Sequence, residues 1–210
     1  MATTTRSTTT KKKAKAPAPA KAKATAPSNG AAPAGSARAR GATDTFTIPG
    51  MSERDAGSAA EILQRRLEAL IDLSLTLKHV HWNVVGNGFI GVHEMLDPQY
   101  QAVALMVDTT AERIATMGVA PNGLAGALVA NRSWEDYALG RAVVPQHLLA
   151  LDSAYSGVIG GHRDALERLG ELDPVTEDMV IGQLAVLEGF QWFIRAHLEN
   201  GEGVMAQPRR

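Results

Sequence analysis

The amino-acid sequence predicts an all-α protein, a four-helix bundle with a short extra helix in the crossover between helices two and three. Four long segments repeat apolar residues at helical spacing, and no segment shows the alternation typical of a strand. Short turns join the first helix to the second and the third to the fourth. A stretch of about 25 residues that contains Gly and Pro separates the second helix from the third.

The first long helix is expected to begin at Ser52, whose hydroxyl can cap the backbone amide of Asp55 three residues later. The helix ends near Gly86. One face of it is apolar apart from a serine and a histidine. This stripe comprises Leu63, Leu67, Leu70, Ser74, Leu77 and His81.

The other helices follow from the same spacing and from their end signals. The second spans about residues 89–117, and a short helix is expected over residues 125–131. The third spans about residues 145–169. The fourth begins with Asp173 as N-cap and Pro174 in the first helical position, and it closes at Asn200 and Gly201. The predicted organisation is a tail over residues 1–44, a bundle over 45–201 and a short C-terminal tail over 202–210.

Charge is unevenly distributed along the chain. The first 40 residues hold nine basic side chains and no acidic one, whereas the other 170 carry 12 basic against 22 acidic, a formal charge of −10. The overall charge of −1 therefore hides a cationic segment joined to an acidic body. With almost no bulky apolar side chain, residues 1–44 are predicted to be disordered. Such a tail favours polyanions, and the alternative is a solvated, solubilising extension.

Composition excludes several classes of protein. The chain has no cysteine, so disulfides, thiolate metal sites and a cysteine nucleophile are ruled out. No apolar run approaches the ~18 residues that span a bilayer, and the N-terminus lacks the apolar core of a secretory signal. Its acid-free Ser, Thr and Arg content leaves a cleaved transit peptide open, but a cytoplasmic protein is the preferred interpretation.

The second helix carries an unusual set of polar side chains. At about 100° per residue, His93, Asp97 and Asp108 fall within roughly 60° of one another and Glu112 within about 100°, on the face of Val103 and its apolar neighbours. Charged groups on an apolar face are costly unless they are paired or bound to a metal. Mixed imidazole and carboxylate ligands suit iron, manganese or zinc, and they favour iron here.

Distance along the helix divides these side chains into two half-sites. Asp97 and Asp108 are 11 residues apart, which is roughly 16 Å of helix, while metal ligands lie at about 2 Å. A second chain, packed antiparallel about a two-fold axis, would bring opposite halves together. His81 of the first helix lies six residues before the turn at Asn87, and His93 lies six residues after it. Antiparallel packing of the two helices would therefore bring the two histidines side by side. The predicted intersubunit site comprises His81, His93 and Asp97 from one chain and Asp108 and Glu112 from its neighbour.

Each of these residues also has a structural interpretation. His81 alone resembles a packed core histidine, and Asp108 and Glu112 alone resemble surface acids beside Arg113. The chain has no Glu followed by His three residues later, so the usual intrachain di-iron centre of four-helix bundles is not expected.

The block KHVHWNVVGNGFIGVHEMLDPQYQAVALMVDTTAERIATMG resembles the signature of the Dps family, the DNA-binding mini-ferritins of starved cells. The segment FQWFIRAHLE resembles the last helix of that family, and the resemblance covers about residues 45–201. It implies a ferritin-like four-helix bundle that assembles as a homododecamer with its sites at two-fold interfaces. It also implies a ferroxidase that oxidises Fe(II), preferably with hydrogen peroxide, and stores ferric mineral in the shell.

The same resemblance assigns roles residue by residue. It makes iron ligands of His81, His93, Asp97, Asp108 and Glu112. Trp82 would sit beside the iron and intercept stray oxidising equivalents, although a packed aromatic is the alternative. Lys78 and Arg113 are expected to form ion pairs. Pro98 lies inside the second helix directly after Asp97, where it removes a backbone donor and favours a kink.

Two further sites concern iron entry and DNA. An acidic pore is expected at Asp173, Glu177 and Asp178, although acids in the first turn of a helix also favour its dipole. Family members that condense DNA use a mobile basic extension, and residues 1–40 resemble one. Non-specific, salt-sensitive binding of double-stranded DNA is expected, with avidity from many tails. The residues assigned to it are Lys11, Lys12, Lys13, Lys15, Lys21, Lys23, Arg38 and Arg40.

Two functions of different classes are therefore expected together. One is the ferroxidase and iron store, and the other is a structural, nucleoid-associated protein that condenses DNA and whose metal site is vestigial or holds zinc. A third interpretation is an organellar ferritin whose tail is cleaved. The preferred location is the cytoplasm, in association with the nucleoid and without a membrane partner.

Overall fold

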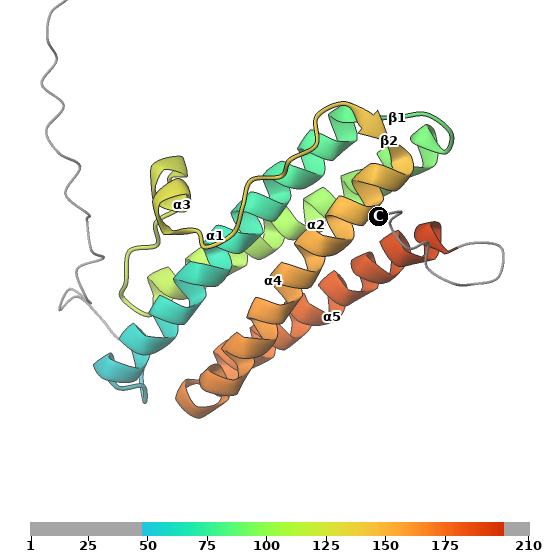
Figure 1. The fold of residues 1–210 in the computed structure, drawn as a ribbon. Helices are drawn as coiled ribbons and strands as arrows, with labels where there is room; N and C mark the ends of the chain where they lie inside the picture. Colours follow the sequence, from blue (N-terminus) through green and yellow to red (C-terminus); the bar gives the residue numbers. More distant parts are fainter. Residues whose placement is uncertain (1–47, 200–210) are drawn as a thin grey trace, which may run out of the picture. The chain divides into compact units, whose positions relative to one another are not determined.

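The computed structural model describes residues 48–199, all of which belong to one compact unit. It confirms the four-helix bundle and the short helix in the crossover (Figure 1). The four long helices are α1 (Glu53–Asn83), α2 (Phe89–Thr116), α4 (Val144–Leu172) and α5 (Pro174–Leu198), and the short one is α3 (Ala125–Asn131). The basic tail assigned to DNA lies outside the described residues, as does the C-terminal tail.

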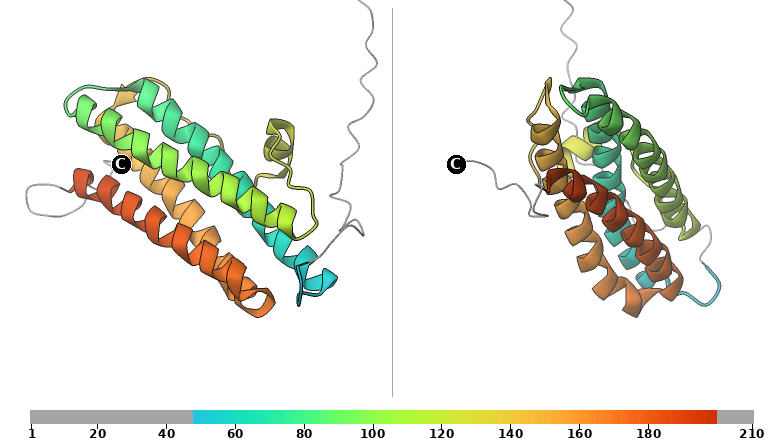
Figure 2. Two further views of the ribbon diagram at one scale, coloured as in Figure 1. Left: turned by 180° about the vertical axis from the view of Figure 1, so that it is seen from behind. Right: turned by 90° about the vertical axis from the view of Figure 1, so that its right-hand side faces the viewer.

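The four long helices form two hairpins that lie side by side. Helix α1 packs against α2 and α4, and α4 packs against α5. The crossover runs over the face made by α1 and α4 (Figure 1). Helices α2 and α5 make the opposite face, which is seen from behind in Figure 2.

The helices begin where their capping residues predict. The Ser52 hydroxyl accepts a hydrogen bond from the Asp55 amide at 3.1 Å, and α1 begins at the next residue after Ser52. At α5 the Asp173 carboxylate accepts from the Thr176 amide at 3.0 Å, and Pro174 occupies the first turn. Helix α5 ends at Leu198 with Glu199 as its C-cap, two residues before the end predicted at residues 200–201.

The leucine stripe of α1 forms the centre of the core. Leu63, Leu70 and Leu77 are 0% exposed, and Leu67 is 1% exposed. Burying each such side chain contributes about 1.5–3 kcal/mol. Ile48, the first described residue, is half-buried and packs against the part of the core that contains Leu63 and Leu67.

A two-residue parallel strand pair is present, which no pattern in the sequence predicts. Strand β1 (Val84–Val85) follows α1, and β2 (Ala142–Val143) precedes α4. Val84 pairs with Ala142 and Val85 with Val143. Pairs this short have no alternating pattern, because they form where two extended helix caps meet. The pairing fixes the end of the crossover beside the α1–α2 turn.

Polar side chains of α1 hold the rest of the crossover. The Gln64 amide contacts both backbone groups of Asn122, at 2.8 and 3.0 Å. Glu68 accepts a hydrogen bond from Asn131 at 2.9 Å, and Asp72 accepts one from the Trp134 indole at 2.7 Å. The three acceptor positions recur every four residues, so they share one face of α1.

No helix within residues 48–199 is long and apolar enough to cross a membrane.

Candidate metal centre

The α1–α2 hairpin brings His81 and His93 into direct contact. Their rings stack with centroids 3.7 Å apart and an interplanar angle of 22°. The sequence places the two residues six positions on either side of the turn, and antiparallel packing brings them level. His81 is buried and His93 half-buried.

Backbone carbonyls determine which ring nitrogen of His81 and of His93 carries a proton in the neutral side chain. Nδ1 of His81 lies 3.0 Å from the carbonyl oxygen of His93, and Nδ1 of His93 lies 2.9 Å from that of His81. A carbonyl oxygen only accepts, so each Nδ1 carries the proton. In the neutral ring this leaves the lone pair on Nε2, which is the form of imidazole that binds a metal ion.

Asp97 lies beside this histidine pair. Its Oδ1 is 3.4 Å from His81 Nδ1 and accepts a hydrogen bond from Lys78 Nζ at 2.9 Å. The Lys78 hydrogen bond is the main cause that lowers the pKa of Asp97, and the two histidines add to it. The carboxylate is therefore ionised at neutral pH. Helix α2 continues through Pro98, which follows Asp97 directly.

The second half-site lies further along α2 and faces outward. Asp108 and Glu112 are both exposed, while Val103 on the same face is buried. The face predicted as buried is thus only partly covered within one chain. Within residues 48–199, no group of three or more His, Asp or Glu side chains is placed to hold a metal ion.

The neighbouring residues divide into exposed and paired groups. Trp82 is 71% exposed, so within this chain it is not the packed core aromatic of the alternative interpretation. Lys78 forms the ion pair with Asp97 described above. Arg113 forms an ion pair with Asp173 on α5, and its Nε donates to the Thr176 hydroxyl at 3.0 Å. Both basic residues therefore have structural partners.

The three acids assigned to an iron-entry pore have different surroundings. Burial alone would raise the pKa of Asp173, but hydrogen bonds from Thr176 and Arg113 bring it below its usual value. Glu177 is half-buried and lies against Gly170, and Asp178 is exposed. Helix capping accounts for Asp173 without a pore, and the pore role of the three residues stays a prediction.

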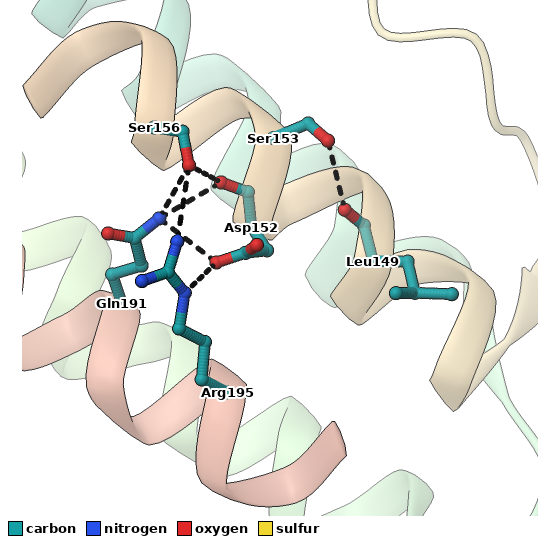
Figure 3. Close-up of polar contacts among 6 residues, drawn as sticks. All are labelled: Leu149, Asp152, Ser153, Ser156, Gln191 and Arg195. Atoms are coloured by element: carbon teal, nitrogen blue, oxygen red, sulfur yellow. Dashed lines mark hydrogen bonds and ion pairs between the residues drawn. The ribbon is translucent and has the colours of Figure 1, made fainter. Parts of the chain in front are cut away.

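A polar cluster between α4 and α5 is not evident from the sequence (Figure 3). Asp152 Oδ1 accepts hydrogen bonds from Gln191 Nε2 at 2.9 Å and from Arg195 Nε at 2.6 Å. Gln191 Nε2 also lies 2.7 Å from the Ser156 hydroxyl. Gln191 and Arg195 of α5 each donate to Asp152 and Ser156 of α4, so the cluster joins the two helices. Helical spacing of polar residues on facing helices is its sole sequence signal.

Comparison with known proteins yields consistent matches. Residues 60–204 match the ferritin family, described as a ferritin-like domain. A DNA protection during starvation protein of Mycolicibacterium smegmatis is 52% identical over 159 residues, which are 76% of this chain and 87% of that one. The fine tangled pili major subunit of Haemophilus ducreyi is 53% identical over 157 residues, 75% of this chain and 83% of that one.

A solved structure also matches along most of the chain. The structure of DpsA14 from Streptomyces coelicolor has a TM-score of 0.76 and 55% identity, and the match covers 79% of this chain and 99% of that chain.

Proposed function

The chain belongs to the Dps family of ferritin-like proteins, and from that membership we propose that it is a ferroxidase and iron store that also binds and protects DNA. One observation carries the ferroxidase proposal. His81 and His93 present free Nε2 atoms beside an ionised Asp97, while Asp108 and Glu112 are exposed roughly 16 and 22 Å further along the same helix.

The proposed reaction takes place between two chains. One chain holds the ferrous ion through His81, His93 and Asp97, and a second chain adds Asp108 and Glu112. Two ferrous ions each give one electron to hydrogen peroxide, which takes up two protons and leaves as two water molecules. The carboxylates stabilise the ferric product, because hard oxygen ligands suit the higher charge. The exposed Trp82 next to His81 is placed to give an electron to a stray oxidant.

The assembly follows from the same incomplete site. A two-fold axis that joins opposite halves creates two equivalent sites for each pair of chains. We place these pairs in a homododecameric shell that stores ferric mineral. Asp173, Glu177 and Asp178 are proposed to line the entry for iron, and the protein is proposed to act in the cytoplasm.

DNA binding is assigned to the basic tail. Residues 1–40 carry nine cationic side chains and no acid, whereas the remainder of the chain has a formal charge of −10. Each tail can neutralise up to about nine phosphates, with an affinity that falls steeply with salt and does not depend on base sequence. Many tails on one particle would bridge duplexes and condense DNA at the nucleoid.

A second candidate is a DNA-condensing protein whose metal site is vestigial or holds zinc. The ion pair between Lys78 and Asp97 favours it, because the lysine already neutralises one of the proposed ligands. Zinc accepts the same imidazole and carboxylate ligands and undergoes no redox change.

Ferrous oxidation by hydrogen peroxide separates the two candidates. His81→Ala and Asp108→Asn should each lower the initial rate by at least about 10–100-fold, because the loss of a group that only supports a metal ligand already costs that much. Glu94→Gln is the matched control, since Glu94 is an exposed acid on α2 outside both half-sites. Formation of ferric product is followed by absorbance. Equal rates in all four proteins would contradict the ferroxidase and favour the structural candidate.

A further inference from the structure

Two adjoining hollows lie between α1 and α4. The larger has a volume of about 720 Å³ and is partly covered by the crossover, and the smaller has a volume of about 320 Å³. Arg66, Gly161 and Asp164 line both, so the hollows meet at these residues. Arg66 lies 15 residues before His81 on α1, about 22 Å along the helix. None of the five proposed iron ligands lines either hollow, so the hollows are separate from the candidate metal centre.

The smaller hollow is rich in arginine. Arg65, Arg66 and Arg168 line it, and Asp164 is the one acid among the residues around it. Burial lowers the pKa of Arg66, and the positive charge of Arg65 lowers it further. Arg65 has a distant partner in Glu61, at 3.7 Å on the exposed surface. Three arginines and one carboxylate line this hollow, so a bound anion would offset the excess positive charge, and the planar donor groups of arginine match phosphate oxygens.

Gly161 makes room for the Arg66 guanidinium. A Cβ atom built at position 161 would overlap Nη1 of Arg66 and crowd its other nitrogen and carbon atoms. Any other residue at position 161 would therefore displace the charged group from the wall between the hollows. This glycine lies inside a helix, where glycine costs about 1 kcal/mol relative to alanine, so a local reason for it is expected.

The larger hollow has apolar walls and two aromatic side chains. Leu73, Ala150 and Val158 line its sides, and Trp134 and Tyr137 close it from the crossover. The indole of Trp134 is held by its hydrogen bond to Asp72, so its orientation is fixed. A cavity of this size with aromatic walls and a few carboxylate acceptors suits a small organic molecule that carries an aromatic ring and donor groups.

We propose that the paired hollows bind a phosphorylated aromatic small molecule of the mononucleotide class. The phosphate binds Arg65, Arg66 and Arg168, and the base enters the larger hollow beside Trp134. Sugar hydroxyls and an exocyclic amino group can donate to the carboxylates there. Duplex DNA is the less favoured ligand, because its stacked bases cannot enter the larger hollow. This site is independent of the proposed iron chemistry.

Equilibrium dialysis of the full chain tests the proposal, with AMP, adenosine and inorganic phosphate as separate probes. AMP should bind more tightly than either part alone. Arg66→Gln should weaken AMP binding at least about tenfold, the effect of losing a charge-assisted hydrogen bond. Arg141→Gln removes the same charge at an exposed position outside both hollows and should leave AMP binding unchanged. Ferrous oxidation should be the same in both variants.

Gly161→Ala tests the geometry without a change in charge. Alanine is the better helix former, so the variant should fold, while its methyl group should displace Arg66 and weaken AMP binding. Trp82→Phe combined with Trp192→Phe leaves Trp134 as the sole tryptophan, and AMP should then change its fluorescence. Equal AMP binding in the parent, Arg66→Gln and Gly161→Ala proteins would overturn the proposal. So would AMP binding no tighter than that of phosphate, or an Arg66→Gln effect confined to duplex DNA.

Discussion

Histidine chemistry at the residue scale depends on what each ring contacts. His81 and His93 are fixed by each other's backbone carbonyls, which leaves their Nε2 atoms free. His162 of α4 is 0% exposed, and its Nδ1 lies 2.9 Å from the Val158 carbonyl. Burial lowers the pKa of His162 to about 4. His81 and His93 therefore have ring nitrogens available to a metal ion, whereas His162 is a neutral core residue.

The buried His162 predicts a loss of stability in acid. Its pKa is about 6.5 in the unfolded chain and about 4 in the folded one, so the unfolded state binds more protons between these values. The contribution is fully present above pH 6.5 and is lost as the pH falls toward 4, by up to about 3 kcal/mol. Urea unfolding of the parent and of His162→Gln at pH 7 and pH 4.5 measures it. The parent should lose more stability than the variant between the two pH values, and equal losses would contradict the prediction.

At the scale of elements, the crossover depends on the polar face of α1. Glu68 is 3% exposed, and its Oε1 accepts from Gln64 at 3.1 Å and from Asn131 at 2.9 Å. It therefore connects α3 to the bundle. Leu124, directly before α3, is 73% exposed, and Val129, within α3, is 64% exposed. This short helix therefore contributes little apolar packing of its own.

Removal of the Glu68 carboxylate should loosen α3. Glu68→Ala removes the acceptor of the half-buried Gln64 amide and of the exposed Asn131 amide, at a cost of about 0.5–1.5 kcal/mol for each hydrogen bond lost, whereas Glu68→Gln keeps one acceptor and should cost less. Hydrogen–deuterium exchange should rise in residues 122–131 of Glu68→Ala and stay unchanged in the middle of α1. Glu61→Gln is the control, because its side chain is 74% exposed. Unchanged exchange at α3 would show that the crossover is held by other contacts.

Local patterns predict the helices well and the crossover poorly. The Ser52 cap, the leucine stripe and the Asp173–Pro174 start depend on neighbours within one or two turns, and the structure has them as predicted. The β1–β2 pair and the contacts of Gln64 join residues about 58 positions apart, so no local spacing reveals them.

The candidate site divides in the same way. The level placement of His81 and His93 follows from their equal distance to the turn. Their proton positions, however, depend on backbone carbonyls across the hairpin, and the partner of Asp97 depends on a lysine 19 residues earlier. The arginine-lined hollow also has no sequence signal, because it requires α1 and α4 to be packed first.

At the scale of the whole molecule, DNA binding and iron oxidation are proposed for parts of the chain that carry opposite charge. Deletion of residues 1–40 removes nine positive charges and leaves a strongly acidic chain. DNA affinity should fall by several orders of magnitude at low salt, and the slope of log K against log salt should shrink toward zero, because counterion release scales with the number of neutralised phosphates. Gel-shift titrations at several salt concentrations measure both. A gel shift that survives the deletion would contradict the prediction and place DNA binding on the folded bundle. Ferrous oxidation should be unaffected by the deletion.

Mixing two inactive variants tests whether the iron site is shared between chains. His81→Ala damages the first half-site and Asp108→Asn the second. In a mixed two-fold pair, one site combines both defects, and the other combines an intact His81 with an intact Asp108. Random pairing makes half of the pairs mixed, so about a quarter of the parental oxidation rate should return after the two variants are unfolded and reassembled together.

The same variants reassembled separately are the control and should keep the low rate of each single variant. A site built within one chain would give no recovery on mixing, since every chain would still lack one ligand. Recovery therefore depends on a contact between copies that a single chain cannot make, because Asp108 and Glu112 are exposed and lie a long way along α2 from His93. A recovered fraction near a quarter indicates that each site takes one half from each of two chains that pair at random.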